Sequence, residues 1–511
     1  MYNFIGDNMK NKNKKQIIFW SVMIITFLSL AIILTTRELQ NDTFYTIKVG
    51  QTIFNNGIDM KEHFSFIPNL AYTYPHWLYD LAIYFIYHFA GFHGVYISSI
   101  VLAFALFVTL YVTTNKIVKD RGLSYFMTII LGMCFRNFIT ARAQLVSYIF
   151  LLLILYSIEM LRETGKKKYF IYIFAFSLLI ANVHLAVWPF IFVLFLPYLV
   201  QDLVYYIKNK FKKQINIYKE KRNISDGVII IEEAKNTKKL LLAVLLVLVT
   251  GFLTPNFLVP FTYFYNTRQG VTMSYISEHL PITISNSPAV FIIFFALVFL
   301  LFQGSMKIKL KDFFFIGGLF LLSLLSNRSF ALFLVLGFYS IARILKSFID
   351  KRLTTIKLED VIDTGYVYVT LSLFMILFSV LNVKSSYRVP YVNPKKYPIG
   401  VSTYIKNNLD VKNIKLFNEY NFGSYLLFEE IPVFYDSRAD LYTEEFNKGC
   451  TAFIDGMKIF DNYRDTFSKY GITHVLIYNT NKLNKVLELD KNYIPLYSDA
   501  NFTLYESLTN K

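Results

Sequence analysis

The sequence predicts a polytopic α-helical membrane protein with about 11–13 spans, followed by a C-terminal α/β domain outside the membrane. Composition is the first observation behind this fold class. Of the 511 residues, 55% are hydrophobic and only 17% are charged, and the mean hydropathy is +0.41. Soluble domains carry about a quarter charged residues. The second observation is that the apolar residues form long unbroken runs, which are typical of membrane spans.

The N-terminal region predicts an anchor that stays in the membrane. Residues 1–16 are polar and basic, and residues 17–36 form the first apolar run. This run is longer than the apolar core of a cleaved signal peptide. The positive-inside rule places the N-terminus in the cytoplasm and the loop 37–75 outside. From Asp42 onward, this loop interleaves apolar and polar residues, which predicts a helix lying along the membrane surface.

Further apolar runs lie at residues 76–90, 94–114, 123–135, 145–161, 169–181, 185–207, 239–255, 289–303, 313–326, 329–345 and 364–383. Basic residues gather in loops that share one side if the spans from 145 onward alternate. The largest of these loops, 208–239, carries ten Lys and Arg against four acids. The net charge of +17 therefore indicates orientation, with the basic loops in the cytoplasm. Attraction to acidic lipid headgroups is compatible with the same charge.

The runs number twelve, whereas a cytoplasmic N-terminus and an outer C-terminus require an odd number of spans. Either 76–90 or 123–135 crosses only part of the membrane, or one run contains two spans. Broken segments at membrane depth line a cavity or are buried in protein.

The residues after 383 predict an extracytoplasmic α/β domain. Residues 384–511 carry 16 Lys and Arg against 15 Asp and Glu. Strands are expected at 414–420, 432–438, 474–479 and 502–506, and helices at 398–409, 443–457, 461–470 and 480–489. Three prolines between 387 and 398 predict an extended linker to this domain.

Several classes of protein are excluded. Cys134 and Cys450 are too few for a disulfide framework or a four-ligand zinc site. The sequence has no glycine-rich nucleotide loop, so we expect no nucleotide cofactor. A soluble enzyme and a nucleic-acid binder fit this composition poorly. The expected location is the plasma membrane, with multiple spans in the lipid bilayer.

Ionisable residues just outside the spans are the candidate functional residues, because such groups are costly in lipid. They are Asp42, Arg136, Arg142, His184, Glu278 with its neighbour His279, and Arg328. Carboxylates suit acid–base chemistry, and the planar fork of arginine suits phosphate. Each has a structural alternative: a helix cap for Asp42, a hydrogen-bonded structural role for His184, and interfacial anchoring for the arginines.

A series of short segments carries a family resemblance. In order along the chain they are Asp42-Thr43-Phe44-Tyr45, Trp77-Leu78-Tyr79-Asp80, Ala141-Arg142-Ala143-Gln144, Ala181-Asn182-Val183-His184, Thr254-Pro255-Asn256, Glu278-His279-Leu280-Pro281, Asn327-Arg328-Ser329, and in the tail 421–426 and 436–442. This series resembles bacterial GT-C glycosyltransferases, which are polytopic enzymes related to protein O-mannosyltransferases and aminoarabinose transferases. Ala143 stands where relatives carry Pro, and His76 stands where many carry Glu. The resemblance covers nearly the whole chain.

The resemblance implies a GT-C-like fold and transfer of a sugar from a polyprenyl-phosphate or pyrophosphate donor to an acceptor hydroxyl. Asp42 would be the general base, and Glu278 a second acid or a metal ligand. Arg142 and Arg328 would hold the donor phosphate, and a single displacement would invert the anomeric centre. Some relatives need a divalent cation and others do not. The acceptor stays open among a glycan, a protein and a lipid.

Two other classes of function stay open beside sugar transfer. One is a surface-polysaccharide polymerase or ligase, against which the C-terminal domain argues. The other is a transporter or flippase, which favours paired halves and ionisable residues at the membrane midplane, whereas this sequence shows no repeat and its candidate ionisable residues cluster at one face. The segment 436–440 contains acids spaced like a metal-binding pair. We interpret it as a turn at a strand end, or as an Asp–Arg pair that holds the C-terminal domain on the membrane part.

Overall fold

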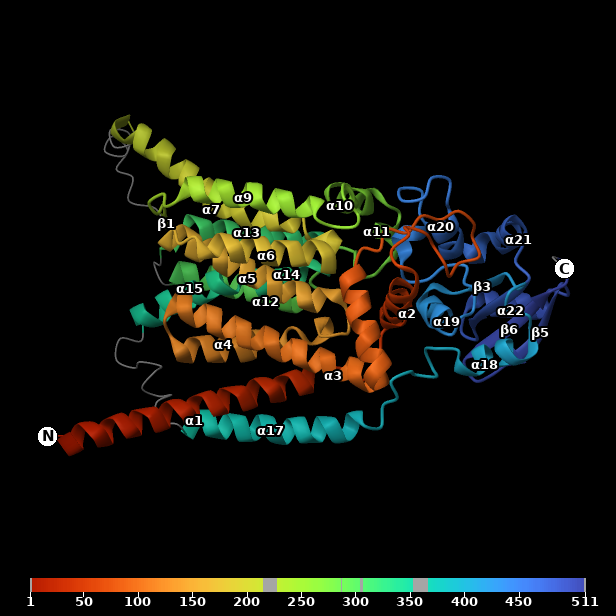
Figure 1. The fold of residues 1–511 in the computed structure, drawn as a ribbon, viewed down its shortest axis with the longest axis horizontal. Helices are drawn as coiled ribbons and strands as arrows, with labels where there is room; N and C mark the ends of the chain where they lie inside the picture. The colour runs from red at the N-terminus through yellow and green to blue at the C-terminus, as the bar shows by residue number, and fades with distance from the viewer. Residues whose placement is uncertain (1, 215–227, 286, 304–306, 353–365, 510–511) are drawn as a thin grey trace.

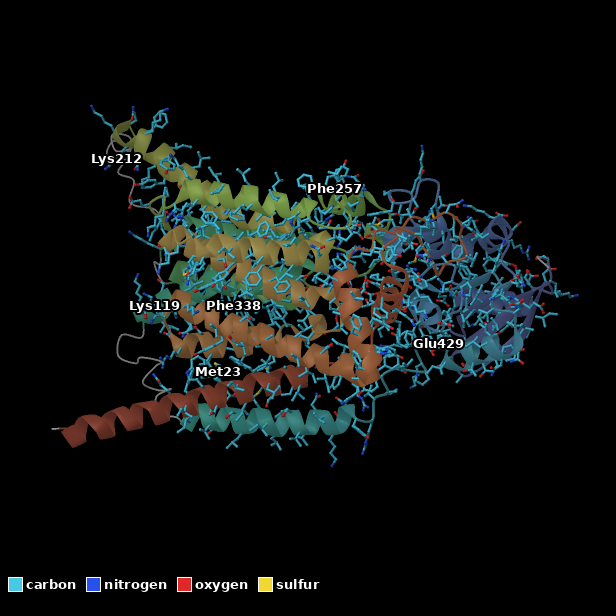
Figure 2. All side chains as sticks on the ribbon, viewed as in Figure 1. Met23, Lys119, Lys212, Phe257, Phe338 and Glu429 are labelled. Carbon is cyan, nitrogen blue, oxygen red and sulfur yellow. The ribbon has the colours of Figure 1, made fainter. Side chains whose placement is uncertain are left out.

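The computed structural model describes the chain except residues 1, 215–227, 286, 304–306, 353–365 and 510–511. Helices run side by side in a bundle, and the C-terminal domain lies beyond one end of it (Figure 1). We call this end the domain end and the other the opposite end. Figure 2 shows Lys119 and Lys212 at the opposite end and Glu429 in the C-terminal domain, while Phe338 lies inside the bundle.

The bundle consists of helices that differ in length. They are α1 (Tyr2–Leu34), α3 (Trp77–Val118), α4 (Arg121–Met133), α5 (Ala143–Thr164), α6 (Lys168–Val183), α7 (Phe190–Lys210), α9 (Thr237–Phe252), α12 (Pro288–Gln303), α13 (Leu310–Leu325), α14 (Ser329–Leu336), α15 (Phe338–Arg352) and α17 (Tyr366–Ser386). Five of the described helical segments are long and apolar enough to cross a membrane, and the bent pair α14–α15 makes a sixth. The chain is therefore a membrane protein, as the apolar runs predicted.

Helix α3 is bent, and the bend concerns the conflict between twelve apolar runs and the odd number of spans that the orientation requires. Gly91 has a φ of 58° and breaks the helix, in a backbone conformation that glycine adopts at little cost. The segment before Gly91 runs across the bundle axis, and the segment after it runs along that axis (Figure 1). Helix α4, which contains most of the run 123–135, lies along the bundle. Of the two short runs, 76–90 is thus the one that lies across the bundle.

Helix α2 (Asn41–Asn56) is the predicted surface helix of the loop 37–75. It packs against the first segment of α3 and against α19 (Tyr420–Phe428). Its buried residues include Phe44, Ile47 and Ile53. Asp42 lies in the first turn, but Gln40 occupies the N-cap position and makes no side-chain capping bond. The helix-cap alternative for Asp42 is therefore not what the structure shows.

The C-terminal domain contains a four-stranded sheet in the order β3-β4-β6-β5. Strand β3 (Leu416–Asn418) is parallel to β4 (His474–Tyr478), whereas β6 (Phe502–Ser507) is antiparallel to both β4 and β5 (Tyr493–Ser498). Helices α18 (Ile399–Asn408), α19, α20 (Ala452–Met457), α21 (Ile459–Tyr470) and α22 (Lys482–Leu489) complete the domain. The predicted α/β architecture is confirmed.

Two predicted elements of this domain are wrong. Residues 432–438 form no strand, because they turn toward the loop 37–75, where Val433 makes one isolated bridge to Ser65. The helix predicted at 443–457 is limited to α20. Strand β5 was missed because it holds Pro495, a residue tolerated only at a sheet edge such as this one.

Of the predicted charged loop 208–239, the structure describes residues 208–214 and 228–239. Within it, β1 (Ile229–Ile230) pairs in parallel with β2 (Ile308–Lys309), just before α13. This short pairing fixes the end of the loop at the opposite end of the bundle.

Candidate active site

A cavity of about 460 Å³ lies where the domain end of the bundle meets the C-terminal domain. Its lining residues come from α2, the loop before α3, the start of α5, helices α10 (Val259–Gln269) and α11 (Thr272–Tyr275), the loop before α14, and the 3₁₀ helix η3 (Ala439–Tyr442). The acidic, basic and histidine residues of the lining are Asp42, His76, Arg142, His184, Arg268, Glu278, His279, Arg328, Arg438 and Asp440. The cavity thus joins segments from distant parts of the chain.

Arg142 lies between two carboxylates in this cavity. Its Nη2 is 2.7 Å from Oδ2 of Asp42, and its Nη1 is 2.7 Å from Oε1 and 3.0 Å from Oε2 of Glu278. The side chain of Asp42 keeps 22% of its surface exposed, so a ligand in the cavity can reach it. Arg142 occupies the N-cap position of α5, which fixes its backbone. Asp42 and Glu278 are therefore joined through Arg142, which pairs with both carboxylates.

The segment that carries Glu278 is tied to the loop before α14. The backbone nitrogen of Arg328 donates to the carbonyl oxygen of Glu278 at 3.1 Å, and Ser326 Oγ donates to the same oxygen at 3.1 Å. Burial disfavours the ionised form of Glu278, but Arg142 and Arg328 outweigh it and lower the pKa of this carboxyl group. Glu278 is thus held as an anion beside two arginines.

The guanidinium of Arg328 has a neutral partner. With the Gln144 amide turned so that its oxygen faces Arg328, that oxygen accepts from Nε at 2.6 Å and also from Nη2. Among the described residues, Arg328 makes no ion pair within 4 Å, in contrast to Arg142. A neutral hydrogen-bond partner orients the guanidinium, and no carboxylate contacts it directly among the described residues, which suits the binding of an anion.

Two of the three histidines that line the cavity, His76 and His184, lie close to each other. His184 Nδ1 lies 2.9 Å from Ser147 Oγ, and its ring centroid is 4.8 Å from that of His76. The backbone nitrogen of Leu185 donates to the Pro75 carbonyl at 3.0 Å, which joins the two histidine segments. The structural alternative for His184, a hydrogen-bonded residue, agrees with this contact, although the side chain also lines the cavity.

The C-terminal wall of the cavity contains Asp440, an acid of the segment 436–440 that the sequence did not place among the candidate site residues. Asp440 is held by Tyr263 Oη at 3.0 Å and Thr267 Oγ1 at 3.2 Å, both donated by α10 to its Oδ2. Burial raises the pKa of Asp440, against the lowering effect of these two hydrogen bonds. The donors lie more than 170 positions earlier in the chain, at separations of 177 and 173 residues. No local pattern identifies such a pairing.

The interpretation of the segment 436–440 as an Asp–Arg pair agrees with the structure. Arg438 contacts Asp436 at 2.6 Å and Glu62 of the loop 37–75 at 2.6 Å, and all three side chains are nearly inaccessible. The guanidinium also lies over the rings of Phe64 and Tyr72, at 5.1 and 4.9 Å from their centroids. This buried triad fastens the C-terminal domain to the membrane part.

The structure brings five of the six predicted residues to one cavity. Asp42, Arg142, His184, Glu278 and Arg328 all line it. Arg136 is exposed in the 3₁₀ helix η1 (Arg136–Phe138) and does not line the cavity. Among the residues that the structure describes, no three His, Cys, Asp or Glu side chains are grouped to hold a metal ion.

Known proteins match this chain in their three-dimensional structures. No family model and no curated protein matches the sequence. The archaeal oligosaccharyltransferase AglB from Archaeoglobus fulgidus, in complex with an inhibitory peptide and a dolichol-phosphate, is similar with a TM-score of 0.59 at 10% identity, over 90% of this chain and 69% of that one. The apo form of an oligosaccharyltransferase from the same organism gives 0.57 at 9% identity, with the same coverage of both chains.

A third similar structure is ArnT from Cupriavidus metallidurans bound to undecaprenyl phosphate. The TM-score is 0.53 at 10% identity, and the match covers 96% of this chain and 97% of that one. At such low identity the likeness is one of fold, and this chain shares the fold of all three structures over nearly its whole length.

Proposed function

Because that shared fold is the GT-C fold, we propose that this protein transfers a sugar from a polyprenyl-phosphate-linked donor to an acceptor hydroxyl. The observation that carries the proposal is the convergence of Asp42, Glu278 and Arg328 on one cavity at the domain end. Two structures of the same fold bind a dolichol-phosphate and undecaprenyl phosphate. A donor carried by a lipid also fits a site built into a membrane protein and the absence of a nucleotide loop from the sequence.

Asp42 is the proposed general base. In a single displacement, the acceptor oxygen bonds to the anomeric carbon, the bond from that carbon to the donor phosphate breaks with its electron pair on the phosphate, and the hydroxyl proton passes to Asp42. The anomeric configuration is inverted. Such proton transfer requires a base within about 3 Å of the hydroxyl. The ion pair with Arg142 orients the carboxylate, and its partial exposure leaves room for the hydroxyl.

Arg328 is the proposed phosphate-binding residue. The leaving phosphate gains one negative charge as the glycosidic bond breaks, and a preorganised cation stabilises that charge. Arg328 carries no carboxylate partner among the described residues, and Gln144 orients it. Arg142 is engaged with Asp42 and Glu278 on both sides, so we assign it the positioning of these two carboxylates. This differs from the phosphate role that the family resemblance implies for Arg142.

The site is proposed to face the outside of the plasma membrane. The basic loops lie at the opposite end of the bundle, where Lys119 and Lys212 are seen, and the positive-inside rule assigns that end to the cytoplasm (Figure 2). The N-terminus lies at the same end (Figure 1). The C-terminal domain, which is nearly neutral, then stands outside and covers the site.

The proposal is tested by transfer from defined donors. Purified protein in liposomes is given polyprenyl-phosphate sugars labelled in the sugar, together with glycan, peptide and lipid acceptors. Nucleotide sugars serve as the comparison donors. We expect label to move only from the lipid-linked donor, into a product of inverted configuration. Transfer from a nucleotide sugar alone, or a product of retained configuration, would contradict the proposal.

A further inference from the structure

A second arginine of the cavity lacks a carboxylate partner among the residues that the structure describes. Arg268 lies in the last turn of α10, lines the cavity, and is partly exposed. Its guanidinium lies 5.4 Å from the ring centroid of Phe264, one turn earlier. In the part of the chain that the structure describes, it makes no ion pair within 4 Å, a property it shares with Arg328 among the four arginines of the cavity.

The charges of the cavity divide into compensated and uncompensated ones. Arg142 bridges Asp42 and Glu278, and Arg438 bridges Asp436 and Glu62, so each arginine has two carboxylates at 2.6–2.7 Å. Neither triad has positive charge to offer a ligand. Arg268 and Arg328, which contact no carboxylate within 4 Å among the described residues, are therefore the open arginines of the cavity, which can pair directly with an anionic ligand.

The two open arginines line the same cavity as His279. His279 lines the cavity, and its pKa falls to about 4 because of burial and the charges of Arg328 and Arg268, which outweigh Glu278. Helix α10 is also held in place on this side, because Tyr263 and Thr267 both bond to Asp440 of the C-terminal domain. Arg268, next to Thr267, thus extends from an anchored helix.

We propose that Arg268 binds a second phosphate group, beside the phosphate bound by Arg328; this rests on the proposed function. An arginine matches a phosphate with two parallel hydrogen bonds, so two open arginines match two phosphates. The second phosphate belongs either to a donor linked through pyrophosphate or to a phosphorylated acceptor. A structural role at the helix end, where a cation complements the helix dipole, predicts no effect on ligand binding.

The test measures binding by calorimetry to the full-length protein in detergent, with wild type, Arg268→Gln and the control Arg136→Gln, whose residue is exposed outside the cavity. For a pyrophosphate donor, we expect wild type to bind undecaprenyl pyrophosphate at least about tenfold more tightly than undecaprenyl phosphate, as an added charge-assisted contact provides. Arg268→Gln removes this preference and leaves undecaprenyl phosphate binding unchanged. The control keeps the preference.

The acceptor arm uses glucose 6-phosphate and glucose, each added to protein saturated with undecaprenyl phosphate. A preference for glucose 6-phosphate that Arg268→Gln abolishes supports the acceptor as the source. The inference is overturned if Arg268→Gln changes neither preference. Inorganic pyrophosphate against inorganic phosphate gives a readout free of lipid and of turnover. If the protein binds no polyprenyl phosphate and transfers no sugar, but Arg268→Gln still weakens pyrophosphate binding, the proposed function fails and the phosphate site stands.

Discussion

The two ends of the bundle each hold a cluster of charged residues, and the clusters differ in how completely the charges are paired. At the opposite end the cluster comprises Glu159, Arg162, Asp202, Glu232, Lys311, Asp312 and Arg343. Each of its basic residues is in contact with an acid, and most of its members are buried. At the domain end, two arginines face a cavity without a carboxylate partner among the described residues.

Helix α5 belongs to both clusters, which makes the comparison direct. Arg142 precedes its first residue and lines the cavity, whereas Glu159 and Arg162 lie near its last turn. Glu159 is 2.7 Å from Lys311 and 3.2 Å from Arg343. The side chains of Arg162 and Asp202 are both fully buried and 3.1 Å apart.

The difference in pairing between the two clusters separates the charges that we expect to stabilise the fold from those that we expect to bind a ligand. A buried charge is tolerated when another charge in the protein compensates it. The closed cluster at the opposite end fulfils this condition and fixes helix ends to one another. The open arginines at the domain end depend on a ligand for compensation, so we expect their loss to affect ligand binding and not folding.

The largest expected effect is on stability and comes from the closed cluster. Arg343→Met leaves Asp312 and Glu159 without their shared partner, and breaking a buried pair costs about 3–5 kcal/mol. We expect a marked loss of folded protein in detergent, measured by size exclusion and thermal unfolding. The matched control is Lys212→Met, an exposed cation at the same end. Equal stability of both variants would show that the closed cluster does not hold the bundle together.

The next effect is on activity and comes from the open end. Arg328→Gln removes the proposed phosphate contact and lowers kcat about 10²–10³-fold, the usual cost of losing one preorganised donor. The melting temperature stays near that of wild type, because the guanidinium bonds only to a neutral amide among the described side chains. Transfer assays measure the fall in kcat, and thermal unfolding of the same preparation measures the melting temperature. A lower melting temperature with normal kcat would show that Arg328 stabilises the fold, as the paired charges at the opposite end do, and does not bind the phosphate.

The smallest expected effect concerns acid. The pKa of His279 is lowered to about 4 by burial and by Arg328, so between about pH 6.5 and pH 4 the unfolded chain binds more protons than the folded one. Stability is therefore lost as the pH falls through that window. The melting temperature of His279→Gln should fall less between pH 7 and pH 5 than that of wild type, by about one or two degrees. An identical acid response of the two proteins would show that burial and the nearby arginines do not lower the pKa of His279.

The sequence predicted the class of fold, and it selected residues that the structure brings to one cavity, for identifiable physical reasons. Apolar runs are local, so they identify membrane helices without knowledge of the packing. Asp42, Arg142, Glu278 and Arg328 were selected because ionisable groups at span ends are costly, and the family resemblance added roles to them. Their convergence on one cavity depends on packing, which the sequence alone does not specify.

The unpredicted features all depend on long-range contacts. Arg438 pairs with Glu62, which is 376 positions away, and Asp440 is held by α10. Arg268 differs from Arg142 and Arg438 in that it makes no ion pair within 4 Å among the described residues, which is a property of the fold. Arg136 was selected by the same rule as Arg142, but the short helix η1 turns it away from the cavity.

The central claim is that Asp42 is the base of a transfer reaction at the domain end. The most direct test measures kcat of Asp42→Asn with a lipid-linked donor, beside donor binding and thermal unfolding of the same protein. We expect kcat to fall by about 10²–10⁴-fold, the usual contribution of a general base, while donor binding and the melting temperature stay near wild type. An Asp42→Asn enzyme with wild-type kcat would show that Asp42 is not the base.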